Sequence, residues 1–244
     1  MTYKMSISYE GSRYKGWQRL KTSRDTIQEK IEFVLSRIFE CSIEIHGSGR
    51  TDAGVHAYNQ IASFKAERVI ECEWLKKEMN RYLPEDIVIL SVENVHESFH
   101  ARFNAKKKVY TYQVWTKETP PVFERHFVYD IQSKPLDQDL MKRASKRLVG
   151  THDFKGFSTD KTKKSTIRTI ESIEFLEEDR VLKIIVTGNG FLYNMVRIIV
   201  GTLLEVGYGI REAETITEVL NSGVRSQAGE TAPAKGLFLT EVIY

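Results

Sequence analysis

The spacing of hydrophobic residues over residues 3–95 constrains the fold more than any other feature of the sequence. Apolar residues alternate with polar ones in residues 3–9, as in a half-buried strand, and they share one helical face in residues 27–38. Thr26 and Glu29 form a capping-box pattern that opens this helix. The following elements are predicted as strands at residues 43–45 and 60–65, a helix at residues 74–82 and a strand at residues 87–95. The order strand, helix, strand, strand, helix, strand is typical of a split βαβ unit, which is an α+β sheet with two helices on one face.

The second half of the sequence has a similar pattern. Asp137 is a typical helix N-cap, and Gly150 stands just after the expected end of that helix. We predict strands at residues 109–115, 170–175, 181–186 and 237–243, and helices at residues 137–149, 191–206 and 213–220. Residues 118–135 contain three prolines and form an irregular insertion. The chain therefore predicts two related α+β units with mixed or antiparallel sheets, as domains of residues 1–103 and 104–244, with an active-site cleft between them.

One short segment, Gly47–Ala57, places a single carboxylate among glycines and other small residues. Glycines permit positive φ angles and the close approach of another backbone, so such a loop can hold Asp52 still and leave space around it. Arg50 stands two positions earlier, and a guanidinium there suits contact with a phosphate. The functional interpretation is a catalytic Asp52 that faces a ligand. The alternative is a tight turn in which Asp52 only caps the backbone.

Arg197 is the one charged residue in the apolar stretch Phe191–Val200. A helix of this composition is expected to be buried on most sides, where a guanidinium needs a carboxylate or phosphate partner. One interpretation is that Arg197 pairs with Asp52. The other is that its side chain reaches water along the helix edge.

The basic residues are more informative in their distribution than in their number, because the net charge is only +3. Three basic groups suggest that positive charge gathers on one side, as a polyanion partner requires. Aromatic residues interleaved with these groups suit the stacking of bases. The groups are Arg13, Lys15, Arg19, Lys21 and Arg24; Arg102, Lys106, Lys107, Lys108 and Lys117; and Lys161, Lys163, Lys164 and Arg168.

Several other classes of protein lack support in the sequence. No apolar run is as long as a membrane span, and the first residues lack a signal-peptide core, so we expect a cytoplasmic protein. The glycines near Asp52 do not match a phosphate-binding loop or a dinucleotide fingerprint, so no nucleotide cofactor is expected. Neither Cys41 and Cys72 nor the pair His96 and His100 has the pattern of a zinc site, so no metal is expected.

The segment Gly49–His56 resembles the active-site loop of the tRNA pseudouridine synthase A family. Further segments of the chain resemble that family in the same order, from about residue 3 to residue 239. They are Tyr9–Gly11 with Gly16–Gln18, Phe99–Phe103, Gly150–Phe154, Phe191–Arg197 and Ala234–Leu237. The resemblance implies an isomerase that converts uridine to pseudouridine at positions 38, 39 and 40 of the tRNA anticodon arm. It also implies a homodimer that needs no cofactor.

The resemblance assigns a role to individual residues. Asp52 would be the catalytic carboxylate and Arg197 its ion-pair partner, while Tyr110 would stack on the target base and Leu237 would pack against the uracil. Arg50 would contact the RNA backbone or fill the vacated stack, and Arg13, Lys15, Lys106, Lys107 and Lys108 would bind RNA. The sequence leaves open whether Asp52 attacks C1′ or assists elimination. Because Gly156–Lys161 departs from the usual family pattern, one alternative is a paralogue acting on another RNA, such as ribosomal RNA. The alternative from another class is a noncatalytic RNA-binding or RNA-folding protein on the same scaffold.

Overall fold

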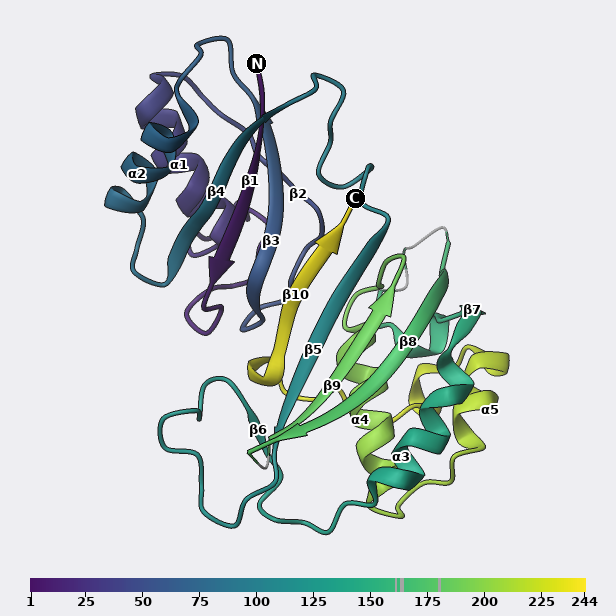
Figure 1. The fold of residues 1–244 in the computed structure, drawn as a ribbon. Helices are drawn as coiled ribbons and strands as arrows, with labels where there is room; N and C mark the ends of the chain where they lie inside the picture. Colours follow the sequence, from purple (N-terminus) through teal and green to yellow (C-terminus); the bar gives the residue numbers. More distant parts are fainter. Residues whose placement is uncertain (161, 163–164, 180) are drawn as a thin grey trace. The chain divides into compact units, whose positions relative to one another are not determined.

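The chain forms two compact α+β units, which a computed structural model describes for residues 1–160, 162, 165–179 and 181–244 (Figure 1). Unit 1 comprises Met1–Lys106 and Phe238–Tyr244, and unit 2 comprises Lys107–Leu237. The predicted fold class is confirmed by strands and helices in both units. The expected division after residue 103 lies three residues before the end of the first segment of unit 1. The last strand, which we expected in the second half, contributes most of its residues to unit 1.

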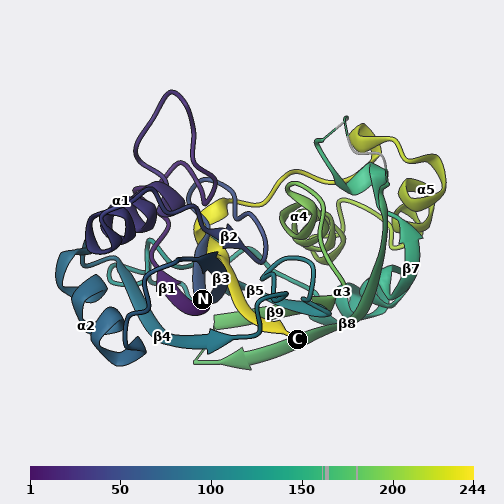
Figure 2. The same cartoon turned by 90° about the horizontal axis from the view of Figure 1, so that it is seen from above.

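Unit 1 is built on a mixed sheet. Its strands, in sheet order, are β4 (Ile87–Val95), β1 (Thr2–Tyr9), β3 (His56–Lys65) and β10 (Leu237–Ile243), and the short β2 (His46–Gly47) also pairs with β3. β1 is antiparallel to both neighbours, whereas β10 runs parallel to β3. The helices α1 (Ile27–Phe39) and α2 (Cys72–Tyr82) lie on the same side of these strands (Figure 2). This arrangement agrees with the predicted split βαβ unit.

The core of unit 1 joins helix α1 to the sheet through aromatic rings. Tyr3 of β1 and Phe64 of β3 stack with their ring centroids 4.9 Å apart. Phe39 at the end of α1 meets both rings edge-on, at 6.0 Å from Tyr3 and 5.7 Å from Phe64. At the other end of α1, the Thr26 side chain accepts a hydrogen bond from the Glu29 N–H, so the predicted N-cap is confirmed.

The predicted strand at residues 43–45 is wrong. Ile43 and Ile45 are buried, as their pattern suggested, but their backbones form no sheet ladder. The Ile43 N–H instead donates to Ser36 Oγ at 3.0 Å, and the Ile45 N–H donates to Glu32 Oε1 at 3.0 Å. Side chains of α1 therefore satisfy the backbone donors that a neighbouring strand would otherwise satisfy.

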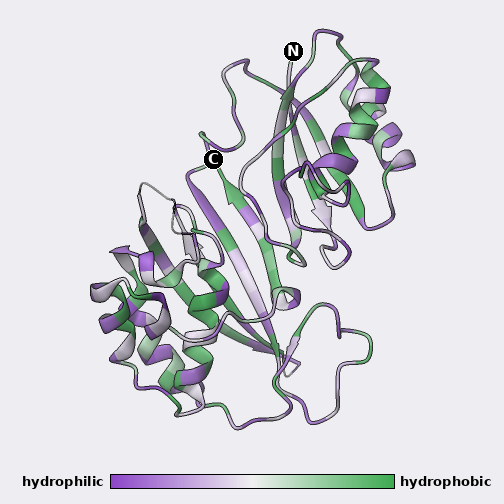
Figure 3. Cartoon of the chain, turned by 180° about the vertical axis from the view of Figure 1, so that it is seen from behind, coloured by the Kyte–Doolittle hydropathy of each residue, from purple (hydrophilic) through white to green (hydrophobic). Residues whose placement is uncertain are grey.

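Unit 2 has an antiparallel sheet that carries helices of its own. Its strands, in sheet order, are β5 (Lys107–Trp115), β9 (Val181–Gly188), β8 (Ile167–Glu178) and β7 (Gly150–Asp153), with β6 (Tyr129–Asp130) parallel to β5. The helices are α3 (Gln138–Ser145), α4 (Met195–Gly207) and α5 (Thr215–Ser222). The short strand β7 was not predicted. Hydrophobic residues lie along the strands of both units (Figure 3).

Helix α4 begins four residues later than its apolar pattern suggested. Asn194 has a φ of +61°, in the left-handed region, and therefore cannot belong to a right-handed helix. The Met195 N–H donates to Leu192 O at 3.1 Å, so the residues before the helix form a turn. Helix α3 starts after its predicted N-cap, Asp137, which accepts a hydrogen bond from the Leu140 N–H. In the described part of the chain, no helix is both long and apolar enough to span a membrane.

Candidate active site

Asp52 is half-buried in the loop between β2 and β3, and hydrogen bonds on either side fix its backbone. Thr51 O accepts from the Trp17 N–H at 3.0 Å, and Thr51 Oγ1 is hydrogen-bonded to the buried Tyr9 hydroxyl at 2.7 Å. The Val55 N–H donates to Asp52 O at 3.1 Å, so that residues 52–55 form a turn that begins at Asp52. Burial raises the pKa of Tyr9, which keeps this hydroxyl protonated and able to donate.

Three glycines allow other backbone and ring atoms to approach the Asp52 loop closely. A Cβ atom at Gly11 would lie 2.0 Å from Val55 O, and one at Gly16 would lie 2.8 Å from Thr51 O. Gly16 also has a φ of +96°, a conformation that other residues rarely adopt. A Cβ atom at Gly47 would lie 2.6 Å from the Trp17 ring. Close packing of backbone and ring atoms against these glycines, together with backbone hydrogen bonds, therefore holds the loop in place.

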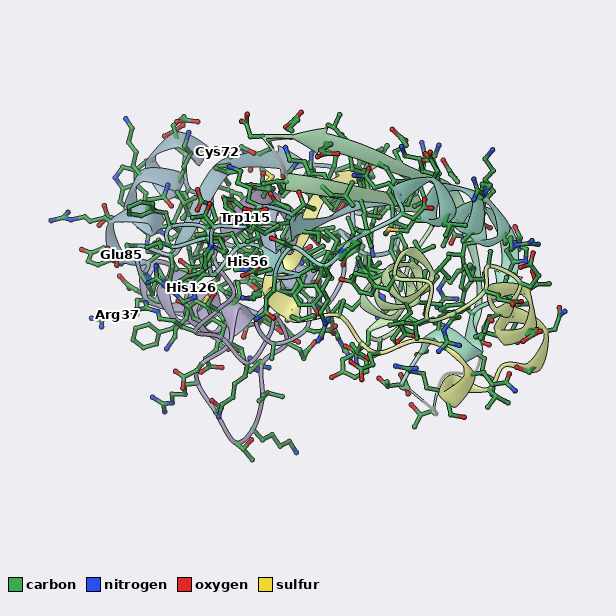
Figure 4. The ribbon with its side chains drawn as sticks, turned by 90° about the horizontal axis from the view of Figure 1, so that it is seen from below. Arg37, His56, Cys72, Glu85, Trp115 and His126 are labelled. Atoms are coloured by element: carbon green, nitrogen blue, oxygen red, sulfur yellow. The ribbon has the colours of Figure 1, made fainter. Side chains whose placement is uncertain are left out.

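Buried polar residues support the two ends of the same loop. Ser48 Oγ donates to Gln60 Oε1 at 2.6 Å, and Gln60 Nε2 donates to Gly49 O at 3.0 Å. At the other end, His56 Nδ1 accepts from the Gly11 N–H at 3.0 Å, and the imidazole ring stacks on Phe238 at 4.7 Å. His56 lies in the interior, whereas Arg37 and Glu85 lie at the edge (Figure 4).

No role was predicted for these supporting residues. Tyr9, Thr51, His56 and Gln60 are polar residues in apolar surroundings, and that pattern alone does not distinguish them from surface positions of a strand. The signal that could have found them is Gly11 and Gly16, because a glycine pair so close to a strand end indicates the close approach of another segment.

The predicted RNA-contacting residues of unit 1 differ in their surroundings. Arg50 and Lys15 are exposed. Arg13 forms an ion pair with Asp86 at 2.7 Å, and the same carboxylate accepts a hydrogen bond from the Tyr14 hydroxyl at 2.5 Å. Burial, followed by the hydrogen bond and the charge of Asp86, raises the pKa of Tyr14. The positive charge of Arg13 is thus partly neutralised by an acid from a distant part of the sequence.

Unit 2 contains Tyr110 and Arg197. Tyr110 is buried on β5, opposite Val186 of β9, and its ring meets Phe191 edge-on at 5.2 Å. Arg197 is half-buried on α4, where its Nε donates to Ala232 O at 2.7 Å and one terminal nitrogen donates to Asn194 Oδ1 at 3.1 Å. The guanidinium orientation is therefore partly fixed by the backbone of residues 232–237.

That same segment leads to Leu237 and is attached to β5. The Tyr112 hydroxyl donates to Pro233 O at 2.8 Å, and a Cβ atom at Gly236 would lie 2.8 Å from the Tyr112 ring. Burial raises the pKa of Tyr112, and the positive charge of Arg197 opposes this rise. Leu237 is buried at the start of β10. Strand β5, helix α4 and the segment 232–237 thus carry Tyr110 and Leu237, which are predicted to contact the base, and Arg197, which is predicted to pair with Asp52.

The basic residues near β5 are also not all alike. Lys106 is exposed, whereas Lys107 forms an ion pair with Glu171 at 2.7 Å. Lys108 follows on the same strand and lies opposite Gly188. In the third basic group, Lys161, Lys163 and Lys164 lie outside the described residues. Arg168 is on β8.

The described residues contain no cluster of three or more His, Cys, Asp or Glu side chains that could hold a metal ion. His96 is hydrogen-bonded to Ser98 at 2.8 Å, and His100 stacks on His46 at 5.0 Å. Both histidines lie in the loop after β4, so their spacing does not place them on one helix. The pairing of Arg197 with Asp52 would join residues of different units and stays a prediction.

A carboxylate on a braced loop and a Tyr–Arg–Leu group in a second unit fit an enzyme that acts on a bound base. The model of the tRNA pseudouridine synthase family matches residues 5–104 and 144–244. The tRNA pseudouridine synthase A 2 of Bacillus anthracis is 48% identical over 241 residues, which are 98% of each chain. The tRNA pseudouridine synthase A of a Bacillus species, strain KSM-64, is 48% identical over 243 residues and 99% of each chain.

The chain belongs to the tRNA pseudouridine synthase family, so the predicted resemblance is confirmed. Members of this family are RNA isomerases. A solved complex of Cbf5, Nop10 and Gar1 is only remotely similar, with a TM-score of 0.40 and 13% identity over 97% of this chain and 48% of that one.

Replacing Gly16 tests how strongly its close contact supports the Asp52 loop. Gly209 is the matched control, because it also has a positive φ, of +68°, but nothing lies within 4 Å of a Cβ atom there. Gly209→Ala should lower the free energy of unfolding by about 1–2 kcal/mol through backbone strain alone. Gly16→Ala should lower it by about 1–3 kcal/mol more, because the new methyl group meets backbone that cannot move aside.

Urea titration measures both losses, and hydrogen exchange of residues 50–57 reports on the loop itself. Faster exchange in this segment is expected for Gly16→Ala only. Equal losses in the two variants, with unchanged exchange, would show that the contact does not brace the loop.

Proposed function

We propose that this chain converts uridine to pseudouridine at positions 38, 39 and 40 of the tRNA anticodon arm, with Asp52 as the catalytic carboxylate. Family membership supports the reaction, and the braced loop around Asp52 supports the choice of residue. Arg197 is its ion-pair partner, which keeps the carboxylate ionised. Tyr110 is the platform for the base, and Leu237 is the apolar wall against the uracil.

The reaction determines what these groups must do. The N1–C1′ glycosidic bond breaks, the detached uracil turns and a C5–C1′ bond forms; C5 then loses its proton and N1 ends with one, so the product is an isomer of the substrate. The base must first leave its stack so that the sugar and both ring edges become accessible. An ionised carboxylate can then attack C1′ or take a proton during elimination, and both routes need Asp52 in a fixed position. An aromatic ring and an aliphatic side chain can hold the uracil while it turns.

The remaining roles follow the same proposal. Arg50 contacts the RNA backbone or fills the space that the base vacates, and its exposure at the end of the loop suits either role. Arg13, Lys15, Lys106, Lys107 and Lys108 attract the phosphates. The protein works as a cytoplasmic homodimer without a cofactor. Pseudouridine mapping of RNA from a strain that lacks the gene tests the target: loss at positions 38–40 supports the proposal, whereas loss in ribosomal RNA or no loss contradicts it.

Asp52→Asn removes the charge and keeps the size of the side chain. Pseudouridine formation should fall by at least about four orders of magnitude, as when other enzymes lose an essential catalytic residue. The release of tritium from 5-tritiated uridine in tRNA measures the reaction directly, because the C5 hydrogen leaves as the new bond forms. Asp139→Asn is the control, because it makes the same change in an exposed carboxylate (81% exposed) on α3 of unit 2. More than trace activity in folded Asp52→Asn protein would eliminate the assignment.

Arg197→Lys keeps the positive charge but loses the planar fork that grips a carboxylate. We expect it to lose most of its single-turnover activity while remaining folded, and Arg197→Met to be nearly inactive. Arg143→Lys, at an exposed position on α3, is the control and should keep full activity. Circular dichroism and thermal melting check the fold of each variant. Normal turnover in Arg197→Met would exclude Arg197 from catalysis.

Affinity for tRNA should fall steeply with salt, because phosphate contacts release counterions. Changing Lys106, Lys107 and Lys108 together to Gln should flatten the plot of log affinity against log salt by about one to two units, since Lys107 already has an acidic partner. A variant with Gln at Lys30, Lys76 and Lys77 carries the same charge change on α1 and α2. This second variant is the control and should keep the wild-type slope. If the variant at Lys106, Lys107 and Lys108 also keeps it, these three lysines do not contact RNA.

A further inference from the structure

Three rings form a column on the surface of unit 1, which we call the ring column: His46, His100 and Phe103. His46 of β2 and His100 stack with their centroids 5.0 Å apart and their planes 19° apart. His100 and Phe103 follow at 4.2 Å and 35°. The Arg102 guanidinium lies 5.8 Å from the centroid of the Phe103 ring.

The loop that carries the ring column is rigidly attached. The Ala101 N–H donates to Ser63 Oγ of β3 at 3.0 Å, and Ala101 O accepts from the Tyr244 hydroxyl at 2.7 Å. Inside the loop, the His100 N–H donates to Asn104 Oδ1 at 2.8 Å. Ala101 is completely buried, so the loop has an anchor at its centre. The rings next to this anchor are therefore held in place before any ligand arrives.

Phe103 is nevertheless 77% exposed. An exposed phenyl ring contributes little to folding through burial, and a rigid loop prevents it from folding back onto the surface. Exposure of one phenylalanine would not by itself indicate a binding site, but Phe103 is the outer ring of a stack on an anchored loop, and binding residues are often found on loops that a rigid scaffold positions.

The charges around the ring column favour a polyanion. Between residues 96 and 106, Glu97 is the one acidic residue, whereas Arg102 and Lys106 are exposed cations. Burial, and then the charge of His46, lowers the pKa of His100, so that this ring is neutral near pH 7 and stacks as an uncharged aromatic. Its Nδ1 accepts from the Arg102 N–H at 3.1 Å, which leaves Nε2 to carry the proton.

We propose that the ring column is a stacking site for an unpaired base of an RNA partner, with Phe103 as the ring on which the base stacks and Arg102 as the contact to a neighbouring phosphate. Every base has a π-face, so such a site binds without reading sequence. The inference depends on the proposed function only in taking RNA as the partner.

The test compares two exposed phenylalanines that each lie near an arginine. Phe33 on α1 is 58% exposed, and its ring lies 5.8 Å from the Arg37 guanidinium, but it has no stacked imidazole. We would measure the Kd of unmodified tRNA transcript for the wild-type protein, Phe103→Ala, Phe103→Trp and Phe33→Ala at one fixed salt concentration. Phe103→Ala should raise the Kd about tenfold or more. Phe103→Trp, which keeps an aromatic ring, should bind about as tightly as wild type, and the Kd of Phe33→Ala should stay within about twofold of wild type.

Thermal melting and sedimentation of each variant accompany the binding curves. Because Phe103 is exposed, its replacement should not change the melting temperature or the oligomeric state. Wild-type affinity in Phe103→Ala would overturn the proposal. So would a change in oligomeric state that explains the lost affinity, because the partner would then be a second copy of the chain. Activity in Asp52→Asn would contradict the proposed mechanism and leave this binding result intact.

Discussion

The contact of one backbone with another around Asp52 is the constraint on which the rest of unit 1 depends. Gly11 lies so close to Val55 that a Cβ atom would meet its carbonyl at 2.0 Å, and a Cβ atom at Gly16 would meet the Thr51 carbonyl at 2.8 Å. The segment that makes these contacts comes directly after β1, and the Asp52 loop comes directly before β3, which pairs with β1. The sheet therefore brings the two segments together, and the missing side chains let them touch. The backbone of Asp52, the residue proposed as the catalytic carboxylate, is therefore held in place by close packing before a substrate binds.

In unit 2, a glycine likewise allows two backbone segments to approach closely near Arg197. A Cβ atom at Gly201 on α4 would lie 1.8 Å from Glu230 O, so the chain at residues 229–232 lies directly on the helix backbone. Thr202 Oγ1 accepts from the Gly229 N–H at 2.9 Å, and Glu205 accepts from the Glu230 N–H at 2.8 Å. The path of this segment sets where Ala232 O meets the Arg197 side chain. Helix α4 thus orients Arg197 indirectly, because it holds residues 229–232 in place and Ala232 O of that segment accepts a hydrogen bond from Arg197.

Local pattern predicted most of the elements and singled out Asp52 and Arg197, whereas the family resemblance supplied Tyr110 and Leu237. Local pattern failed where tertiary contacts compete with local ones. The caps at Thr26 and Asp137 were predictable because each depends on residues within one turn. The strand expected at residues 43–45 was wrong because Glu32, thirteen residues before Ile45, supplies the Ile45 N–H with an acceptor that no periodicity reveals. The start of α4 was misplaced because an apolar run does not show that Asn194 turns left-handed. The roles of His56 and Gln60 in bracing the loop were likewise not predictable, since they depend on which segments meet in space.

The fold places acidic residues beside some of the cations that stand in acid-free segments of the sequence. The first two basic groups contain no acid in sequence, yet Asp86, Glu32 and Glu171 lie against three of their members. Among the described residues, Lys15 and Lys106 have no such acidic neighbour and remain exposed. Each cation that already has an acid displaces fewer counterions when a phosphate arrives, so its share of the affinity for RNA falls. The exposed cations without an acidic neighbour are therefore expected to carry most of the salt-dependent affinity for RNA. The stacking proposed for the ring column would add affinity that is less sensitive to salt, at little entropic cost because the rings are held on a rigid loop.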